Sequence, residues 1–195
     1  MSKIKHFLGL HIICNHSKWT ISVDQTHYIQ CILKHFDMQT YLPTYTPLPM
    51  DTILTVNPEK ESDTSLTTCY QQIIGSLMYA MLGMRLDICF TVNHLSQYGS
   101  NLTHDHMLTA QHVLKYLATT QHHKLMYGAN DLTKLIGYSN SNWANDRDDH
   151  CLTTGYTFIL SGGSIAWAAQ KQCTIALSLT EVEYIFRVKW LYVSL

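Results

Sequence analysis

The hydrophobic and polar positions in the first part of the chain predict a β-hairpin followed by a helix. Residues 7–14 form an apolar run, and residues 15–24 supply a turn and then alternate apolar with polar positions. Such alternation is typical of a strand with one buried face. In 26–36 the apolar side chains are spaced three and four positions apart, which predicts an amphipathic helix with Asp24 or Thr26 as its cap.

A proline-rich stretch separates this unit from a helical middle. All four prolines lie within 39–68, which has few large apolar residues and is therefore predicted to be an extended connector. Residues 69–98 are apolar enough for two helices, divided near 84–87. A further helix is predicted over 107–117, because five apolar side chains share one helical face: Met107, Ala110, Val113, Leu114 and Leu117.

The last third of the chain changes to a pattern of short strands. Residues 134–139, 155–160 and 164–169 are strand-like and are separated by turn-rich segments, and we expect Ile165 and Trp167 on one face of the third strand. Gly162 and Gly163 are expected to form a hairpin turn, and residues 180–195 an apolar helix. Three strands and a helix are half of an α/β layer and need further elements to cover them.

Composition narrows the possible function classes. Of the 195 residues, 46% are hydrophobic and 14% are charged, and the 13 basic against 14 acidic residues leave a net charge of -1. A real core can form, and no basic patch for nucleic acid is evident. The six cysteines have no C-x-x-C pair, so we expect reduced, mostly buried thiols. Without a signal peptide or a membrane-length apolar run, we expect an intracellular protein of the cytoplasm or nucleus that is not secreted.

Common catalytic and metal-binding motifs do not occur in this sequence. The 12 histidines include no H-E-x-x-H, and no glycine-rich phosphate loop or G-x-S-x-G is present. Most histidines are therefore interpreted as exposed or hydrogen-bonded residues. Asp146, Asp148 and Asp149 allow two interpretations, a metal cluster or a solvated hairpin turn, and the second is favoured because no partner ligands lie near them in the predicted topology.

Five segments, in order and spacing, resemble the Pol polyprotein of copia-type LTR retrotransposons. GYSNSNWANDRDD at 137–149, the strand pair within 153–172 and ALSLTEVEY at 176–184 resemble its ribonuclease H segment. The helices within 69–120 are similar to the segment that joins reverse transcriptase to ribonuclease H. The region from FLGLHI to TPLPM, residues 7–50, resembles the end of the polymerase palm and the start of the thumb.

This resemblance implies an α+β fold: a β-hairpin with thumb-like and connection helices, followed by an incomplete ribonuclease H-like α/β layer. Residues 1–50 would be the end of the palm and the start of the thumb, 51–68 a linker, 69–128 the helical thumb/connection region, and 129–195 a truncated ribonuclease H-like domain. Because the layer is incomplete, we expect an exposed sheet edge and exposed apolar surface that drive self-association.

The resemblance also identifies the candidate site residues. The family's ribonuclease H holds two Mg²⁺ ions with about four carboxylates. The first falls at Asn140, where an amide replaces the expected Asp, and the second at Glu181. Asn142 also stands where the family commonly has an acidic residue, and Glu183 points to another side of the helix. The family's third and fourth carboxylates lie downstream of Leu195, so Glu181 alone is insufficient for a metal and no cofactor is expected.

These observations predict a remnant of the Pol polyprotein without polymerase or nuclease activity. No Y-x-D-D turn is present, and Leu86, Leu102 and Leu179 depart from the family's usual prolines and small residue. The alternative is a residual or reused module that binds RNA·DNA hybrid weakly or acts as a scaffold. An active nuclease would need metal ligands from another chain. No membrane partner is expected.

Overall fold

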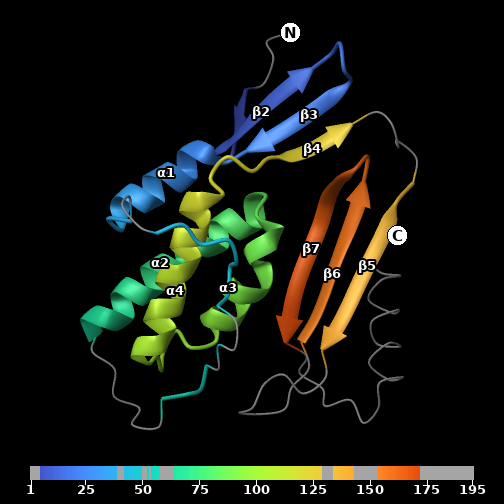
Figure 1. The fold of residues 1–195 in the computed structure, drawn as a ribbon. Coiled ribbons are helices and arrows are strands. Elements are labelled where there is room, and N and C mark those ends of the chain that lie inside the picture. The colour runs from blue at the N-terminus through green and yellow to red at the C-terminus, as the bar shows by residue number, and fades with distance from the viewer. Residues whose placement is uncertain are drawn as a thin grey trace.

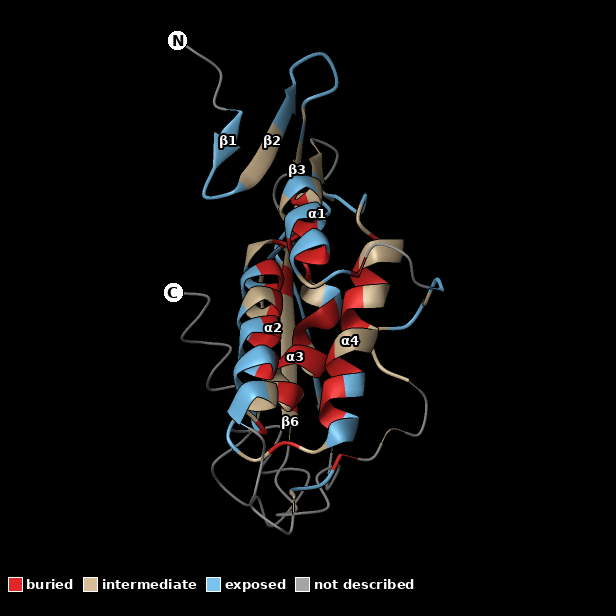
Figure 2. Ribbon diagram, turned by 90° about the vertical axis from the view of Figure 1, so that its left-hand side faces the viewer, coloured by how far each residue is buried: buried red, intermediate tan, exposed pale blue. Residues whose placement is uncertain are grey.

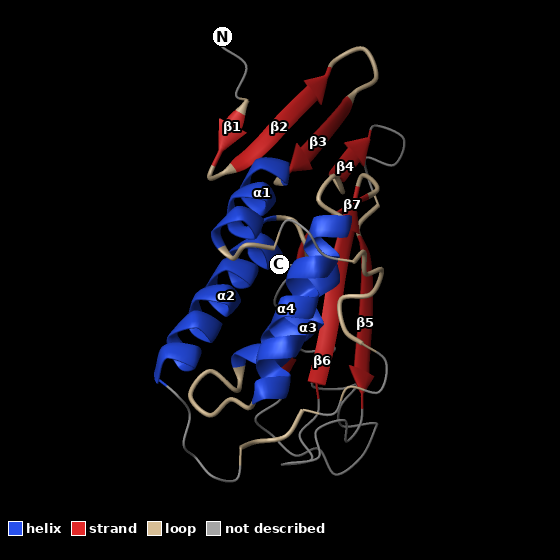
Figure 3. Cartoon of the chain, turned by 60° about the vertical axis from the view of Figure 1, so that its left-hand side comes forward, coloured by secondary structure: helices blue, strands red, loops and turns tan. Residues whose placement is uncertain are grey.

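The computed structural model describes most of the chain, and all structural statements below refer to that part: residues 5–38, 42–49, 52, 54–57, 64–128, 134–142 and 153–171. Within it, the fold is α+β, with a group of helices and two antiparallel sheets (Figures 1 and 3). The predicted helix over 180–195 and the aspartates at 146, 148 and 149 lie outside the described residues.

The predicted hairpin is confirmed and belongs to a larger sheet. Its strands are β2 (Leu10–Asn15) and β3 (Thr20–Asp24), and β1 (His6–Phe7) pairs with β2. The expectation of a buried face is only partly met, since no residue of β2 is fully buried. The fourth strand, β4 (Leu125–Gly128), pairs antiparallel with β3, so the end of the predicted helical region 69–128 is a strand. Leu125, Met126 and Tyr127 are all apolar, so the strand lacks the alternation of apolar and polar residues by which it could be recognised.

The first helix, α1 (Thr26–His35), is where the apolar spacing predicts it. Ile29, Ile32 and Leu33 are buried, and its buried face packs into the main core. Its cap differs from the prediction: Gln25 is the N-cap residue and makes no side-chain capping bond. Asp24 lies one residue earlier, and its carboxylate accepts a hydrogen bond from the Thr26 N–H at 3.3 Å.

The helical middle is confirmed with one corrected boundary. The first long helix, α2 (Thr64–Gly83), is followed by the 3₁₀ turn η1 (Leu86–Ile88) and by α3 (Cys89–Ser96), so the break falls where predicted. However, α2 already includes 64–68, which was assigned to the connector. Serine and threonine are weak helix formers, but here Thr68 donates its hydroxyl hydrogen to the Thr64 carbonyl at 2.9 Å, within the helix.

The main core lies between the helices. On α4 (His104–Thr119), the five apolar residues of the predicted face are all buried. They pack with α2, which has a buried inner side and an exposed outer side, and with α3, in which no residue is exposed (Figure 2). Leu102, which stands at one of the family's proline positions, is also buried in this core. None of the helices in the described part is long and apolar enough to cross a membrane.

The second sheet contains β5 (Ile136–Asn142), β6 (Thr153–Leu160) and β7 (Gly163–Lys171), in that order. All three strands and the turn at Gly162 are as predicted, while Gly163 already pairs with Leu160. Ile165 and Trp167 do not act as one face. The register passes from Ser164 to Ala166, which leaves Ile165 unpaired and exposed in a bulge, whereas Trp167 packs on the main core.

The four cysteines in the described part of the chain differ from the expectation of mostly buried thiols, and Cys151 and Cys173 lie outside that part. Cys14, Cys31 and Cys69 are exposed, and Cys89 is buried, all four as free thiols. The exposed ones lie on the hairpin and on the outer sides of α1 and α2, where cysteine is tolerated as a small residue.

Candidate functional site

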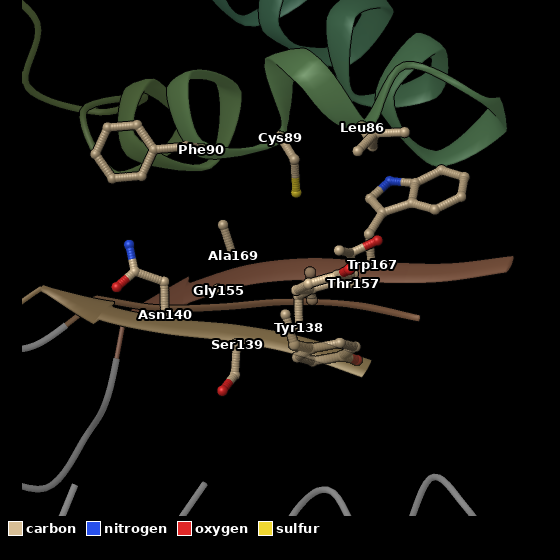
Figure 4. A pocket seen from close by; sticks show the side chains of 12 residues that line it. Leu86, Cys89, Phe90, Tyr138, Ser139, Asn140, Gly155, Thr157, Trp167 and Ala169 are labelled. Carbon is tan, nitrogen blue, oxygen red and sulfur yellow. The ribbon is translucent and has the colours of Figure 1, made fainter. Parts of the chain in front are cut away.

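An open groove of about 280 Å³ lies between the helices and the second sheet. Leu86, Cys89 and Phe90 from η1 and α3 form one wall, and β5, β6 and β7 form the other (Figure 4). The groove is the place where the structure brings a residue implied by the family resemblance, Asn140, next to other side chains.

Asn140 is an exposed residue in the middle of β5, opposite Gly155 of β6. Its side chain points from the sheet toward the helical wall, and the side chain of the preceding Ser139 points the other way (Figure 4). This alternation follows from the period of two in a strand. The amide therefore lies where a carboxylate could face the groove, but it carries no charge.

The helical wall is held by specific contacts. The Trp167 indole N–H donates a hydrogen bond to the Met81 carbonyl at 3.1 Å, which ties β7 to the end of α2. The Cys89 thiol points toward the sheet (Figure 4) and lies 3.5 Å from the Asn93 amide nitrogen. Burial raises the pKa of Cys89, so the thiol stays protonated and is a poor nucleophile.

A charge network around the buried Arg85 and the more exposed Asp87 fixes the turn that carries Leu86 and Cys89. Arg85 is 1% exposed, and its guanidinium donates to the Asp87 carboxylate at 2.7 and 3.0 Å and to the Thr120 carbonyl at 3.2 Å. The Tyr116 hydroxyl donates to the same carboxylate at 2.8 Å. Burial alone would raise the pKa of Asp87, but the bonds and charge of Arg85 outweigh it and hold that pKa below its ordinary value.

A second cavity, of about 450 Å³, lies between the first sheet and the start of α1. His6, His11 and His27 line it beside Asp24, whose carboxylate lies 3.3 Å from His11 Nδ1 and 3.4 Å from Lys124 Nζ. Burial would raise the pKa of Asp24, but its hydrogen bonds to His11, the Thr26 N–H and Lys124 lower it. Among the described residues, no group of three or more His, Cys, Asp or Glu side chains is arranged to hold a metal ion.

Of the other residues that the resemblance singles out, some lie in the described part of the chain and others outside it. Asn142 is the last residue of β5. Glu181, Glu183 and Leu179 lie outside the described residues. Leu86 lines the groove. The sequence analysis missed the Arg85 network, although an arginine and an aspartate two residues apart, inside an otherwise apolar stretch, are a signal for a buried ion pair.

The described lining of the groove does not supply the ligands for a pair of Mg²⁺ ions. Hard dications need several anionic oxygen ligands. Among the described lining residues, Asn140 supplies one neutral amide oxygen, and the remaining side chains are apolar, aromatic, hydroxyl or thiol groups. No step of metal-assisted hydrolysis can be built on this donor set.

Comparisons with known proteins place the chain among transposon polyproteins. It is 32% identical over 185 residues to the retrovirus-related Pol polyprotein from transposon TNT 1-94 of Nicotiana tabacum, which covers 93% of this chain and 14% of that protein. It is 33% identical over 184 residues to the corresponding polyprotein from transposon RE1 of Arabidopsis thaliana, and this alignment covers 93% of this chain and 12% of that protein. The chain thus spans about one-eighth of the length of these relatives.

A shorter relative covers part of the chain. Secreted RxLR effector protein 161 of Plasmopara viticola is 40% identical over 115 residues, which are 59% of this chain and 81% of that protein. No family model matches the chain, and no solved structure matches it.

Over 93% of its length, the chain is similar to a segment of transposon-encoded polyproteins. The chain belongs to the family of copia-type retrovirus-related Pol polyproteins.

Proposed function

We propose that the chain is a remnant of the reverse transcriptase/ribonuclease H region of a copia-type Pol polyprotein and has neither polymerase nor nuclease activity. The order of its elements supports this assignment: a hairpin and helix, a helical middle, and then three antiparallel strands that begin with β5. The sequence resemblance gives the same order, from palm and thumb through the connection to the start of ribonuclease H.

The observation that carries the proposed loss of activity is Asn140. The resemblance assigns this position to the first metal-binding carboxylate, and in the structure the side chain faces an open groove (Figure 4). An aspartate could present its charge there, whereas the amide offers one neutral oxygen. Two divalent ions need several negative charges nearby, so the substitution removes a ligand on which the chemistry depends.

The test is cleavage of a labelled RNA·DNA hybrid by the purified chain in Mg²⁺ or Mn²⁺. We expect no cleavage by the wild type, by Asn140→Asp or by Glu181→Ala, with an active ribonuclease H as the positive control. The Asn140→Asp protein should stay inactive because one restored carboxylate still leaves the set of about four incomplete. Metal-dependent cleavage by the wild type, lost in Glu181→Ala, would show that the chain is an enzyme.

The same hybrid serves to test the alternative of a reused binding module. Phosphate contacts give an affinity that falls steeply as salt rises. We expect no such binding, because the chain has a net charge of -1. Salt-dependent retention of the hybrid would favour the binding module over an inert remnant.

A further inference from the structure

The edges of the two sheets differ in how well they are protected. In the first sheet, β1 has two residues, and β4 has four and packs against the turn after β6, where the Gly128 N–H donates to the Ser161 carbonyl at 2.9 Å. In the second sheet, β7 carries the bulge at Ile165 and lies against α3. Short strands, bulges and covering helices are the usual devices that prevent an edge from pairing with another chain.

Within the described part of the chain, the remaining edge, β5, has none of these devices. Within the described residues β5 pairs only with β6, in regular register along all seven residues from Ile136 to Asn142. The strand contains no charged residue and no proline. Its residues 137–140 are exposed, and Tyr138 is 59% exposed. Of the three strands in the second sheet, β5 is also the farthest from α2, α3 and α4, which gather on the β7 side (Figure 1).

We propose that β5 is a homodimer interface, in which β5 of a second copy pairs antiparallel with it across a twofold axis at Ser139. This register pairs all seven residues, from Ile136 opposite Asn142 to Ser139 opposite itself. The resulting sheet has six strands, with a β5 strand of each copy at its centre. The inference is independent of whether the chain has catalytic activity.

The register is self-complementary in its side chains as well. Tyr138 of one copy lies opposite Asn140 of the other, and the twofold axis repeats the pair. Directly opposite residues of an antiparallel pair share one face, and Tyr138 and Asn140 both line the groove. The phenol and the amide are thus placed to hydrogen-bond across the interface. The helices of both copies lie on this face, but over the distant β7 strands.

The length of the β5–β5 ladder indicates how tightly the two copies should bind. Seven residues at about 3.4 Å each give a ladder about 24 Å long. An interface built mainly from one strand pair is of the small class found in weak, transient complexes rather than in obligate dimers. The dimer should therefore dissociate on dilution, and each copy should remain folded through its helical core.

Sedimentation of the full chain over a range of concentrations tests the association. We expect a monomer–dimer equilibrium without larger species. Ser139→Lys places two like charges at the twofold axis and should weaken the dimer about tenfold while leaving the melting temperature unchanged. Ile165→Lys, at an exposed position on the other edge of the same sheet, is the matched control and should dimerise like the wild type. A monomeric wild type, or equal weakening by both variants, would overturn the proposal.

A cross-link tests the register. Opposite residues in an antiparallel pair have Cα atoms about 4.5 or 5.5 Å apart, which is within the range of a disulfide. In a background with the exposed Cys14, Cys31 and Cys69 replaced by serine, Ser139→Cys should form a disulfide-linked dimer on mild oxidation. Mass spectrometry should find position 139 of one copy joined to position 139 of the other. Ile165→Cys should not cross-link. Dimers joined through position 165 and not 139 would refute the β5 interface.

Discussion

The helical region and the second sheet differ in how completely they are closed within the chain. Between α2, α3 and α4, side chains such as Leu77, Val92 and Leu114 are fully buried. In β5 the exposed residues run from Gly137 to Asn140, and the groove beside them stays open. Among the described residues, the helical region therefore completes its own core, whereas helices cover only one side of the second sheet.

The residues that stabilise the fold therefore lie in a different part of the molecule from the position that the family uses for catalysis. The helices bury the large apolar side chains that dominate folding free energy, and the Arg85 network ties the α2–η1 turn to the end of α4. The position that the family resemblance assigns to catalysis lies on the open strand. Substitutions should then have large effects on unfolding in the helices and small effects on β5.

The largest effect is expected from Asp87→Asn. The Asp87 side chain is 32% exposed, but Arg85 is 1% exposed and would be left as a buried charge without its counter-ion, which costs about 4 kcal/mol. Urea denaturation of the variant and of the wild type measures this, with the exposed Asp37→Asn as a control that should stay within about 0.5 kcal/mol. An Asp87→Asn protein as stable as the wild type would mean that the network does not tie the helices together.

The same pair predicts a dependence on pH. The pKa of Asp87 is lowered in the folded state, so its contribution is fully present above the unfolded value of about 3.9 and is lost as pH falls through the lower folded value. Below about pH 4 the wild type should therefore lose stability more steeply than Asp87→Asn. Parallel acid profiles of the two proteins would contradict this assignment.

A somewhat smaller loss is expected when the helical core is opened. Leu114 of α4 is fully buried, and Leu114→Ala should cost about 3 kcal/mol through lost burial and the cavity left behind. Leu108 lies on the same helix with 49% of its surface exposed, so Leu108→Ala should cost less than about 1 kcal/mol. Equal losses in the two variants would show that the helical core is not the stabilising region.

The contact between the two sheets gives an intermediate case. A Cβ added at Gly163 would lie 2.6 Å from the Met126 carbonyl oxygen and 2.7 Å from the Tyr127 ring, so Gly163→Ala must push β4 and β7 apart. Overpacking of this kind costs about 2 kcal/mol. At Gly155 the nearest atom is 3.8 Å away, and Gly155→Ala should be close to neutral. Thermal unfolding of both variants measures these effects. A Gly163→Ala protein as stable as Gly155→Ala would mean that β4 and β7 move apart at little cost.

The periodicity of apolar residues predicts the longer helices and strands. The features that it does not predict depend on pairing between strands that are far apart in the sequence or on their register. The face of α4 and the three strands of the second sheet follow from periodicity. By contrast, β4 is a strand because it pairs with β3, about a hundred residues earlier, and no local signal in its four residues records that pairing. The bulge at Ile165 similarly depends on the register with β6.

In the candidate site, the family resemblance identifies Asn140, whereas only the structure shows which side chains lie around it. No periodicity indicates that Phe90 and Cys89 face the second sheet, because this depends on how α3 packs on β7. The spacing of Arg85 and Asp87 in the sequence is a signal for an ion pair. The hydrogen bond from Arg85 to the Thr120 carbonyl, by contrast, depends on how α4 packs.

The smallest effect on stability is expected for a substitution of Asn140. This substitution tests most directly the difference between the helical region and the second sheet. Asn140→Asp adds one charge at an exposed position of β5, so the free energy of unfolding should change by less than about 0.5 kcal/mol. A ligand stabilises the folded state only if it binds there, and one added carboxylate among the neutral groups of the groove is too few for a hard dication. Millimolar Mg²⁺ should therefore leave the melting temperatures of the wild type and of Asn140→Asp equally unchanged, with Ser139→Asp, whose side chain points away from the groove, as the charge control. An increase confined to Asn140→Asp would mean that other carboxylates of the chain reach the groove, and that this open strand retains a metal site from which a single ligand is missing.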